Sequence, residues 1–94
     1  MFLLLSYDIT GSAARLQKVA HICEKYGVRV QNSVFELDLN ISDLTKLKLE
    51  LNKVIDLTVD SIRIYRLGKN YKSQVELIGV RRSAELSQDD AFFL

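Results

Sequence analysis

The first third of the chain alternates apolar runs with short polar breaks. The run at residues 2–9 predicts a buried strand, one face of which carries Phe2, Leu4, Ser6 and Asp8. Ser12 is suited to cap a helix over residues 13–26. The apolar stripe of that helix is predicted to be Leu16, Val19, Ala20, Cys23 and Tyr26. Gly27 then predicts a left-handed end to the helix.

The middle and end of the chain contain further stretches of alternating apolar and polar residues. Residues 28–39 predict two short strands joined by a tight turn or bulge near Asn32. Ser42 is expected to cap a second helix over roughly residues 43–55, with Leu49 off its apolar stripe and exposed or at an interface. Alternating residues predict a strand at 60–67, a turn at 68–72 and a last strand at 74–78.

This order of elements predicts an α/β (α+β) fold of the ferredoxin-like kind, βαββαβ with an additional C-terminal strand. Its antiparallel sheet carries two helices on one face, and the other face needs cover from a partner or remains wet. Residues 1–79 form the predicted domain. Residues 80–94 form a C-terminal tail with an apolar end, which either docks on a partner or another protomer or is a frayed terminus.

Composition excludes several classes of site. Cys23 is the only cysteine, so no internal disulfide can form, and it is expected to be a small buried residue. His21 is the only histidine, which excludes two-histidine metal motifs and predicts a surface position. No glycine-rich phosphate loop is present. No segment suits a signal peptide or a membrane span, so the expected location is the cytoplasm, without membrane contact.

Charge is unevenly distributed along the chain. Residues 61–82 carry six basic residues against a single acid, Glu76. This segment is either part of an ordinary mixed surface or a basic face that suits a polyanion such as nucleic acid.

Asp8 is the most informative candidate for chemistry. A carboxylate at the end of an apolar strand must be hydrogen-bonded, paired or bound to metal. It either caps amides of the first helix or has a functional role. One carboxylate is a poor Mg²⁺ site, but a dimer would offer Asp8 twice, and two copies near a twofold axis could share one hydrated ion.

Other candidates for a functional role are spread along the sequence. Basic side chains contact phosphates without reading sequence, and the candidates of this type are Arg15, Lys18, Arg29, Arg63 and Arg66. Tyr7 adjoins Asp8, and Phe35 either stacks on a base or belongs to the core. If the basic residues bind a duplex, affinity should fall steeply with salt.

Three stretches together resemble a known family. These are YDI at residues 7–9, RVQNSVFE at 29–36 and DSIRIY at 60–65. They resemble the CRISPR-associated adaptation proteins usually called Cas2, over roughly residues 1–79. The resemblance implies a homodimer that bridges dimers of the CRISPR integrase (Cas1) on DNA. It also implies a Mg²⁺-dependent endonuclease acting on single-stranded RNA or double-stranded DNA. It assigns the metal to Asp8 and further catalytic roles to Tyr7, Arg15, Arg29 and Phe35.

The functional hypothesis is therefore a dimeric subunit of spacer acquisition with metal-dependent nuclease activity. Two alternatives keep the same fold: a non-catalytic scaffold of the adaptation complex, and a toxin-type ribonuclease unrelated to CRISPR. A small-ligand regulatory domain is a further alternative, because this fold hosts many functions.

Overall fold

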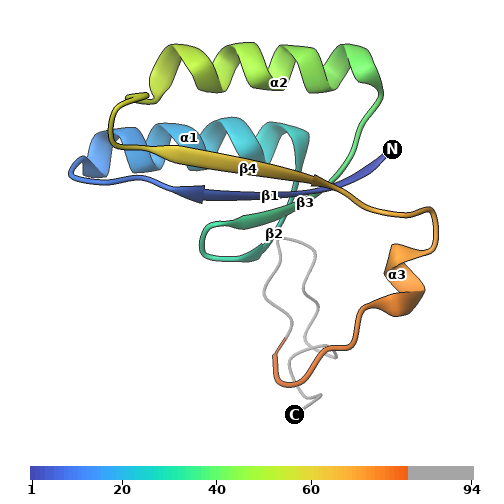
Figure 1. Cartoon of the computed structure of the whole chain (residues 1–94). Helices are drawn as coiled ribbons and strands as arrows, with labels where there is room; N and C mark the ends of the chain where they lie inside the picture. The colour runs from blue at the N-terminus through green and yellow to red at the C-terminus, as the bar shows by residue number, and fades with distance from the viewer. Residues whose placement is uncertain (81–94) are drawn as a thin grey trace.

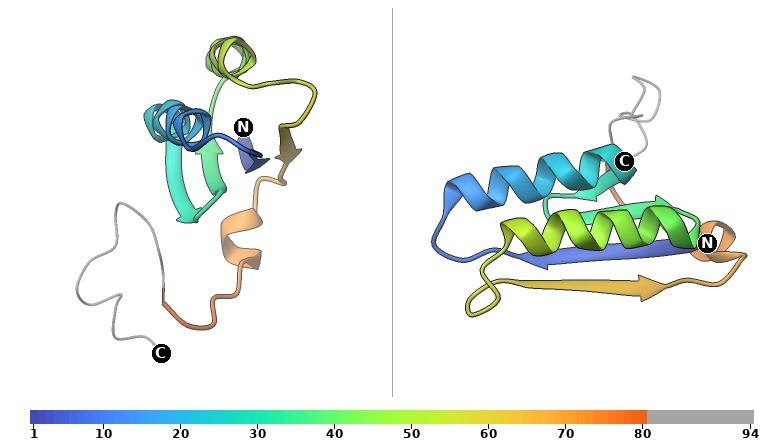
Figure 2. Two further views of the ribbon diagram at one scale, coloured as in Figure 1. Left: turned by 90° about the vertical axis from the view of Figure 1, so that its left-hand side faces the viewer. Right: turned by 90° about the horizontal axis from the view of Figure 1, so that it is seen from above.

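The structure is a computed structural model, which describes residues 1–80 of the 94. Its elements in chain order are β1 (Phe2–Asp8), α1 (Ala13–Tyr26), β2 (Gly27–Gln31), β3 (Val34–Asp38), α2 (Ile41–Val54), β4 (Ser61–Arg66) and α3 (Tyr71–Gln74). The strands form one sheet in the order β2-β3-β1-β4, with every neighbouring pair antiparallel. Both long helices lie on one face of this sheet (Figures 1 and 2). The predicted ferredoxin-like α+β arrangement is confirmed.

The core lies between the helices and the sheet. Strand alternation turns Leu3, Leu5 and Tyr7 toward the helices, where they meet Phe35 and Leu37 of the neighbouring strand. The helices contribute their own buried apolar side chains, namely Val19, Cys23, Leu44, Leu47 and Leu51. Cys23 is fully buried as expected, and this burial raises the pKa of its thiol to about 12. His21 is exposed, as predicted.

Helix α1 begins as the sequence predicts, but its buried stripe is narrower. The Ser12 hydroxyl accepts the Arg15 backbone N–H at 3.1 Å, which confirms the cap. Leu16, predicted to be buried, is 42% exposed. It lines a surface hollow beside the polar β2–β3 turn at Asn32 and Ser33.

Gly27 does not end α1 in a left-handed conformation. Its φ is −164°, which is extended backbone, and it is the first residue of β2. A Cβ atom here would collide with the Leu37 side chain and the Glu36 carbonyl oxygen on β3. Glycine is therefore required because two strands approach closely. The predicted turn is confirmed at Asn32 and Ser33, with a register irregularity between Arg29 and Gln31.

Helix α2 begins two residues earlier than predicted. The Asn40 side chain accepts the Asp43 backbone N–H at 2.8 Å, so Asn40 is the cap and the predicted cap Ser42 lies inside the helix. Both residue types suit a cap, and the sequence offers both within one turn. Leu49 was expected to be exposed or at an interface, and it is exposed.

The additional strand predicted at residues 74–78 is wrong for the chain as described. Residues 71–74 form the short helix α3, and residues 75–80 form no strand. Tyr71 anchors α3, because its ring lies 4.8 Å from the Phe2 ring and its hydroxyl donates to Glu36 Oε2 at 3.4 Å. The predicted docking tail, residues 80–94, lies outside the described residues apart from Val80.

The side of the sheet that faces away from α1 and α2 is called the open face below. Register places on it the side chains of Phe2, Leu4, Ser6, Asp8, Val34, Glu36, Asp38, Ser61, Arg63 and Tyr65. Tyr71 covers the end of this face near Phe2 and leaves the end near Asp8 uncovered. Among the helices of residues 1–80, none has the length and apolar character to cross a membrane.

Candidate active site

Asp8 lies at the uncovered end of the open face. It is the last residue of β1, it is exposed, and it pairs in register with Ser61 of β4. A shallow hollow of about 320 Å³ surrounds it, lined by Ser6, Tyr7, Asp8, Ser61, Arg63 and Tyr65. Most of these side chains belong to the open face, so the hollow opens away from the two long helices.

The Asp8 carboxylate takes no part in holding the loop that follows it. The loop that follows it is held by other side chains: the Thr10 N–H donates to Asp60 Oδ1 at 3.0 Å, and Ser12 caps α1. The hypothesis that Asp8 caps the first helix is therefore wrong. Within residues 1–80, the Asp8 carboxylate has neither a hydrogen-bond partner nor an ion pair. An exposed carboxylate of this kind is available to a ligand.

The donors around Asp8 suit a hard cation when they are doubled. Mg²⁺ prefers six oxygen ligands and is usually held by one or two carboxylates with several waters. One chain offers the Asp8 carboxylate and the hydroxyls of Ser6 and Ser61. No group of three metal-ligating side chains gathers anywhere in residues 1–80. The residues therefore fit Mg²⁺ if two protomers each contribute Asp8, which stays a prediction.

A cationic side chain, that of Arg63, lies in the same hollow as Asp8. Arg63 Nη1 donates to the Tyr65 hydroxyl at 3.4 Å, and this bond raises the pKa of the Arg63 guanidinium above its usual value. Both side chains are exposed on β4, two positions apart and therefore on the same face. The hollow thus combines an anion that suits a metal with a cation that suits a phosphate.

Tyr7, Phe35 and Arg29 form a separate cluster on the helix side of the sheet. The Tyr7 hydroxyl donates to the Asn32 carbonyl oxygen at 3.1 Å, and the Tyr7 and Phe35 ring centroids are 6.2 Å apart. The Arg29 guanidinium lies 5.2 Å from the Phe35 ring centroid and donates to the Tyr7 hydroxyl at 3.4 Å. Phe35 is 0% exposed, so it belongs to the core and does not offer its ring to a base.

Strand alternation therefore divides the predicted catalytic residues. Adjacent residues of a strand point to opposite faces, so Tyr7 points into the core while Asp8 points out of the open face. Tyr7 contributes to the hollow around Asp8 without sharing its face. Phe35 and Arg29 act on the other side of the sheet, where they support Tyr7 and the β2–β3 turn.

Arg15 is engaged by a carboxylate that the sequence did not single out for a role. Its Nε donates to Asp60 Oδ2 at 2.8 Å, and its Nη2 donates to Asp60 Oδ1 at 3.3 Å and to the Thr10 carbonyl oxygen at 2.7 Å. The Asp60 side chain is fully buried. The Arg15 guanidinium is the main cause that lowers the pKa of Asp60, to about 2. At neutral pH both groups are charged, and they neutralise one another.

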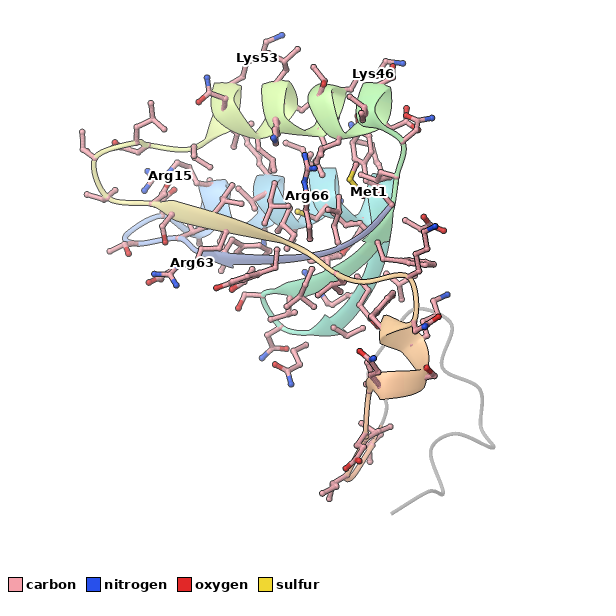
Figure 3. All side chains as sticks on the ribbon, turned by 45° about the vertical axis from the view of Figure 1, so that its right-hand side comes forward. Met1, Arg15, Lys46, Lys53, Arg63 and Arg66 are labelled. Atoms are coloured by element: carbon pink, nitrogen blue, oxygen red, sulfur yellow. The ribbon has the colours of Figure 1, made fainter. Side chains whose placement is uncertain are left out.

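The remaining predicted cations lie on different surfaces. Arg63 and Arg66 are three positions apart on β4, so they point to opposite sides of the sheet (Figure 3). Arg66 pairs with Leu3 and lies on the side of the helices, whereas Arg63 pairs with Ser6 on the open face. Lys18 is exposed on α1. One flat face of the sheet cannot present all of these cations, although the edge formed by β4 can present both arginines.

Sequence reasoning missed Asp60 as a member of the site. The residues that pair, Arg15 and Asp60, are 45 positions apart in the chain, so no local spacing relates them. The available signal was weak: an acid at the start of an apolar strand, where an unpaired carboxylate is costly.

Fold and site together define a small α+β protein in which, within residues 1–80, an exposed carboxylate without a partner lies at a strand end on the open face of the sheet. Residues 1–75 match the sequence model of the family described as CRISPR associated protein Cas2. The chain belongs to this family.

Individual relatives agree over nearly the whole chain. The CRISPR-associated endonuclease Cas2 of Halalkalibacterium halodurans is 52% identical, over 92% of this chain and 94% of its own length. The CRISPR-associated endoribonuclease Cas2 3 of Rhodospirillum rubrum is 39% identical, over 89% of this chain and 93% of its own length. The crystal structure of Streptococcus pyogenes Cas2 at pH 6.5 superposes with a TM-score of 0.77 at 44% identity, covering 84% of this chain and all of that one.

Proposed function

We propose that this chain is a CRISPR-associated nuclease that acts as a homodimer in the cytoplasm, with Mg²⁺ held between two Asp8 side chains. It binds RNA or DNA and bridges the CRISPR integrase during spacer acquisition. The observation that carries the proposal is the exposed, unengaged Asp8 carboxylate in a chain of the Cas2 family. The names of the relatives, endonuclease and endoribonuclease, support a phosphodiester substrate.

In the proposed dimer, the residues of the hollow around Asp8 would take part in cleavage of a phosphodiester. Bound Mg²⁺ would polarise the phosphate and lower the pKa of a coordinated water. Asp8 would hold the ion, and the Ser6 and Ser61 hydroxyls are hydrogen-bonding groups for its waters. Arg63 would bind a non-bridging phosphate oxygen, because a guanidinium matches the geometry of that group. Tyr7 and Phe35 would act indirectly, by stabilising the strand that carries Asp8.

Longer contact with nucleic acid would use the cations outside the hollow. Lys18 on α1 and Arg66 on β4 are exposed, and Arg29 is half-buried. Such contacts read charge and not base sequence, so affinity for RNA or DNA should fall steeply as salt rises.

The open face supports the homodimer. It carries the half-buried Leu4 and Val34 and the 43% exposed Tyr65, and within residues 1–80 no helix lies over its Asp8 end. Apolar side chains continue beyond α3 at Val75, Leu77 and the 96% exposed Ile78. A second copy placed face to face would bury this surface and bring two Asp8 side chains together.

The test compares cleavage of labelled single-stranded RNA and duplex DNA by the wild type and Asp8→Ala, with Mg²⁺ and with a chelator. We expect Mg²⁺-dependent cutting that Asp8→Ala lowers by at least about 100-fold, because the variant removes the proposed metal ligand. Asp43→Ala is the matched control, since Asp43 is a carboxylate on α2, on the other side of the sheet from Asp8. It should retain wild-type cleavage.

Each other outcome has a definite meaning. Equal cutting by wild type and Asp8→Ala would show that Asp8 is not the catalytic metal ligand. An absence of cutting by the wild type would favour the non-catalytic scaffold, and binding to the integrase and to DNA would then be measured in its place.

A further inference from the structure

We infer that Asp60 is a positioning residue for Asp8, and that Arg15 is its partner in this role and not a phosphate contact. The Asp60 carboxylate accepts four hydrogen bonds from three segments of the chain. The donors are the Thr10 N–H at 3.0 Å, the Asp56 N–H at 2.9 Å, Arg15 Nε at 2.8 Å and Arg15 Nη2 at 3.3 Å. It thus joins the loop after β1, the helix α1 and the loop before β4.

The pair fixes the backbone directly after Asp8. Asp60 accepts the Thr10 N–H, while Arg15 Nη2 donates to the Thr10 carbonyl oxygen at 2.7 Å. Both backbone groups of Thr10 are therefore bound to one ion pair. Gly11 follows with a φ of +80°, a left-handed turn that lets the chain enter α1.

The same carboxylate fixes the strand opposite Asp8. Asp60 directly precedes Ser61, which pairs with Asp8 in the β1–β4 register. The buried ion pair therefore holds the site from two sides: through Thr10 on the chain of Asp8 and through Ser61 on the neighbouring strand. Displacing a reacting group by about 1 Å can lower a rate about 100-fold, so this support is expected to matter for cleavage.

Arg15 is poorly placed to serve a phosphate at the same time. Its Nε and Nη2 are engaged by Asp60 and Thr10, and the charge of Asp60 already balances its own. An arginine that contacts phosphate through its charge contributes to the salt dependence of binding, about one unit in the slope of log affinity against log salt. An arginine that acts through Asp60 contributes nothing to that slope.

The test uses Asp60→Asn, Arg15→Gln and the double variant in the full chain. Asp56→Asn is the matched control, since among residues 1–80 the Asp56 carboxylate accepts hydrogen bonds from Thr58 alone, within its own turn. We expect both single variants to lose protection of the Thr10 amide in hydrogen exchange and to shift the Asp8 carboxyl resonance, while Asp56→Asn does neither. If Arg15→Gln fails to fold, Arg15→Lys takes its place in the exchange and resonance measurements, because lysine keeps the charge but loses the paired N–H donors of the guanidinium.

The second readout is the salt slope of nucleic-acid affinity, measured with a chelator so that no cleavage occurs. Arg15→Gln should leave the slope unchanged, whereas Lys18→Gln, a neutralised exposed cation on the same helix, should lower it. A slope lowered by Arg15→Gln would overturn the inference. So would an unchanged Asp8 resonance in both Asp60→Asn and Arg15→Gln.

The cleavage readout rests on the proposed function. If the wild type cleaves, each single variant should cut about 10- to 100-fold more slowly, and the double variant should be no slower than either. If the wild type does not cleave, the proposed function fails, and the exchange, resonance and salt measurements still decide the role of Asp60.

Discussion

At the scale of single residues, the Asp60 carboxylate is fully buried and accepts four hydrogen bonds. A buried carboxylate is costly unless its oxygens are satisfied. Here the Arg15 side chain and two backbone N–H groups satisfy them. These bonds favour the charged form, and the Arg15 bond is the main cause that lowers the pKa from 3.8 to about 2.

This pKa shift predicts how stability depends on pH. A carboxyl whose pKa is lower in the folded state stabilises the fold above its unfolded pKa, and this stabilisation is lost as pH falls through the folded value. For Asp60 the loss should occur between about pH 4 and pH 2. The urea midpoints of the wild type and Asp60→Asn should therefore differ at pH 6 and converge toward pH 2. A difference that stays constant over this range would contradict the prediction.

The comparison of wild type with Asp60→Asn also isolates this carboxyl from others. The pKa values of Glu50 and Asp56 are lowered as well, by hydrogen bonds from Lys25 and from Thr58 respectively. Both groups are present in the two proteins, so their shared contribution to acid unfolding cancels in the difference.

The residue scale also shows what sequence reasoning could reach at the site. Asp8 was identifiable, because a carboxylate that ends an apolar run is conspicuous in any sequence. Strand alternation alone also predicts that Asp8 and Tyr7 point to opposite faces of the sheet. The engagement of Arg15 was not identifiable, because it depends on a contact between positions 45 apart and on the burial of Asp60, which only the tertiary fold creates.

At the scale of elements, β2 and β3 approach one another closely at Gly27. The site lacks room for any side chain, since a Cβ atom would collide with the Leu37 side chain and the Glu36 carbonyl oxygen. Gly27 also connects α1 directly to β2, so the helix and the hairpin depend on the same residue.

This close contact predicts the effect of a single methyl group. Gly27→Ala should lower the free energy of unfolding by about 1–3 kcal/mol, because overpacking forces the strands apart. Gly68→Ala is the control, since its Cβ would meet nothing within 4 Å. It should leave stability unchanged or slightly raised. Urea unfolding of both variants is the measurement. Equal stability of Gly27→Ala and wild type would show that β2 and β3 can separate freely.

The elements differed in how well they could be predicted. The two long helices and four strands follow from periodicity, because each buries one apolar face against the same core. The start of α2 was misplaced, since Asn40 and Ser42 are both good caps and only backbone geometry decides between them. The strand at 74–78 was wrong because alternation indicates a suitable surface but not a neighbouring strand, and residues 1–80 provide none for it.

At the scale of the whole molecule, the sheet separates two functions. The helix side closes the core around Phe35 and Leu37, which fixes the fold. The open face carries Asp8 at one end and is covered by Tyr71 at the other. A domain of this size buries a modest fraction of its surface, so covering the open face with a second copy would also stabilise the fold.

A dimer formed through the open face predicts a specific sensitivity to charge. Leu4→Lys places a long cationic side chain in the middle of this face, beside its register partner Glu36, and in the dimer this charge would have to be removed from water. We expect the wild type to sediment as a dimer and Leu4→Lys as a folded monomer, with circular dichroism to verify the fold. Leu49→Lys is the matched control, because Leu49 is an exposed leucine on α2 on the other side of the sheet. It should remain a dimer. A dimeric Leu4→Lys, or a monomeric wild type at every concentration tested, would refute the face-to-face arrangement and with it the shared Asp8 site.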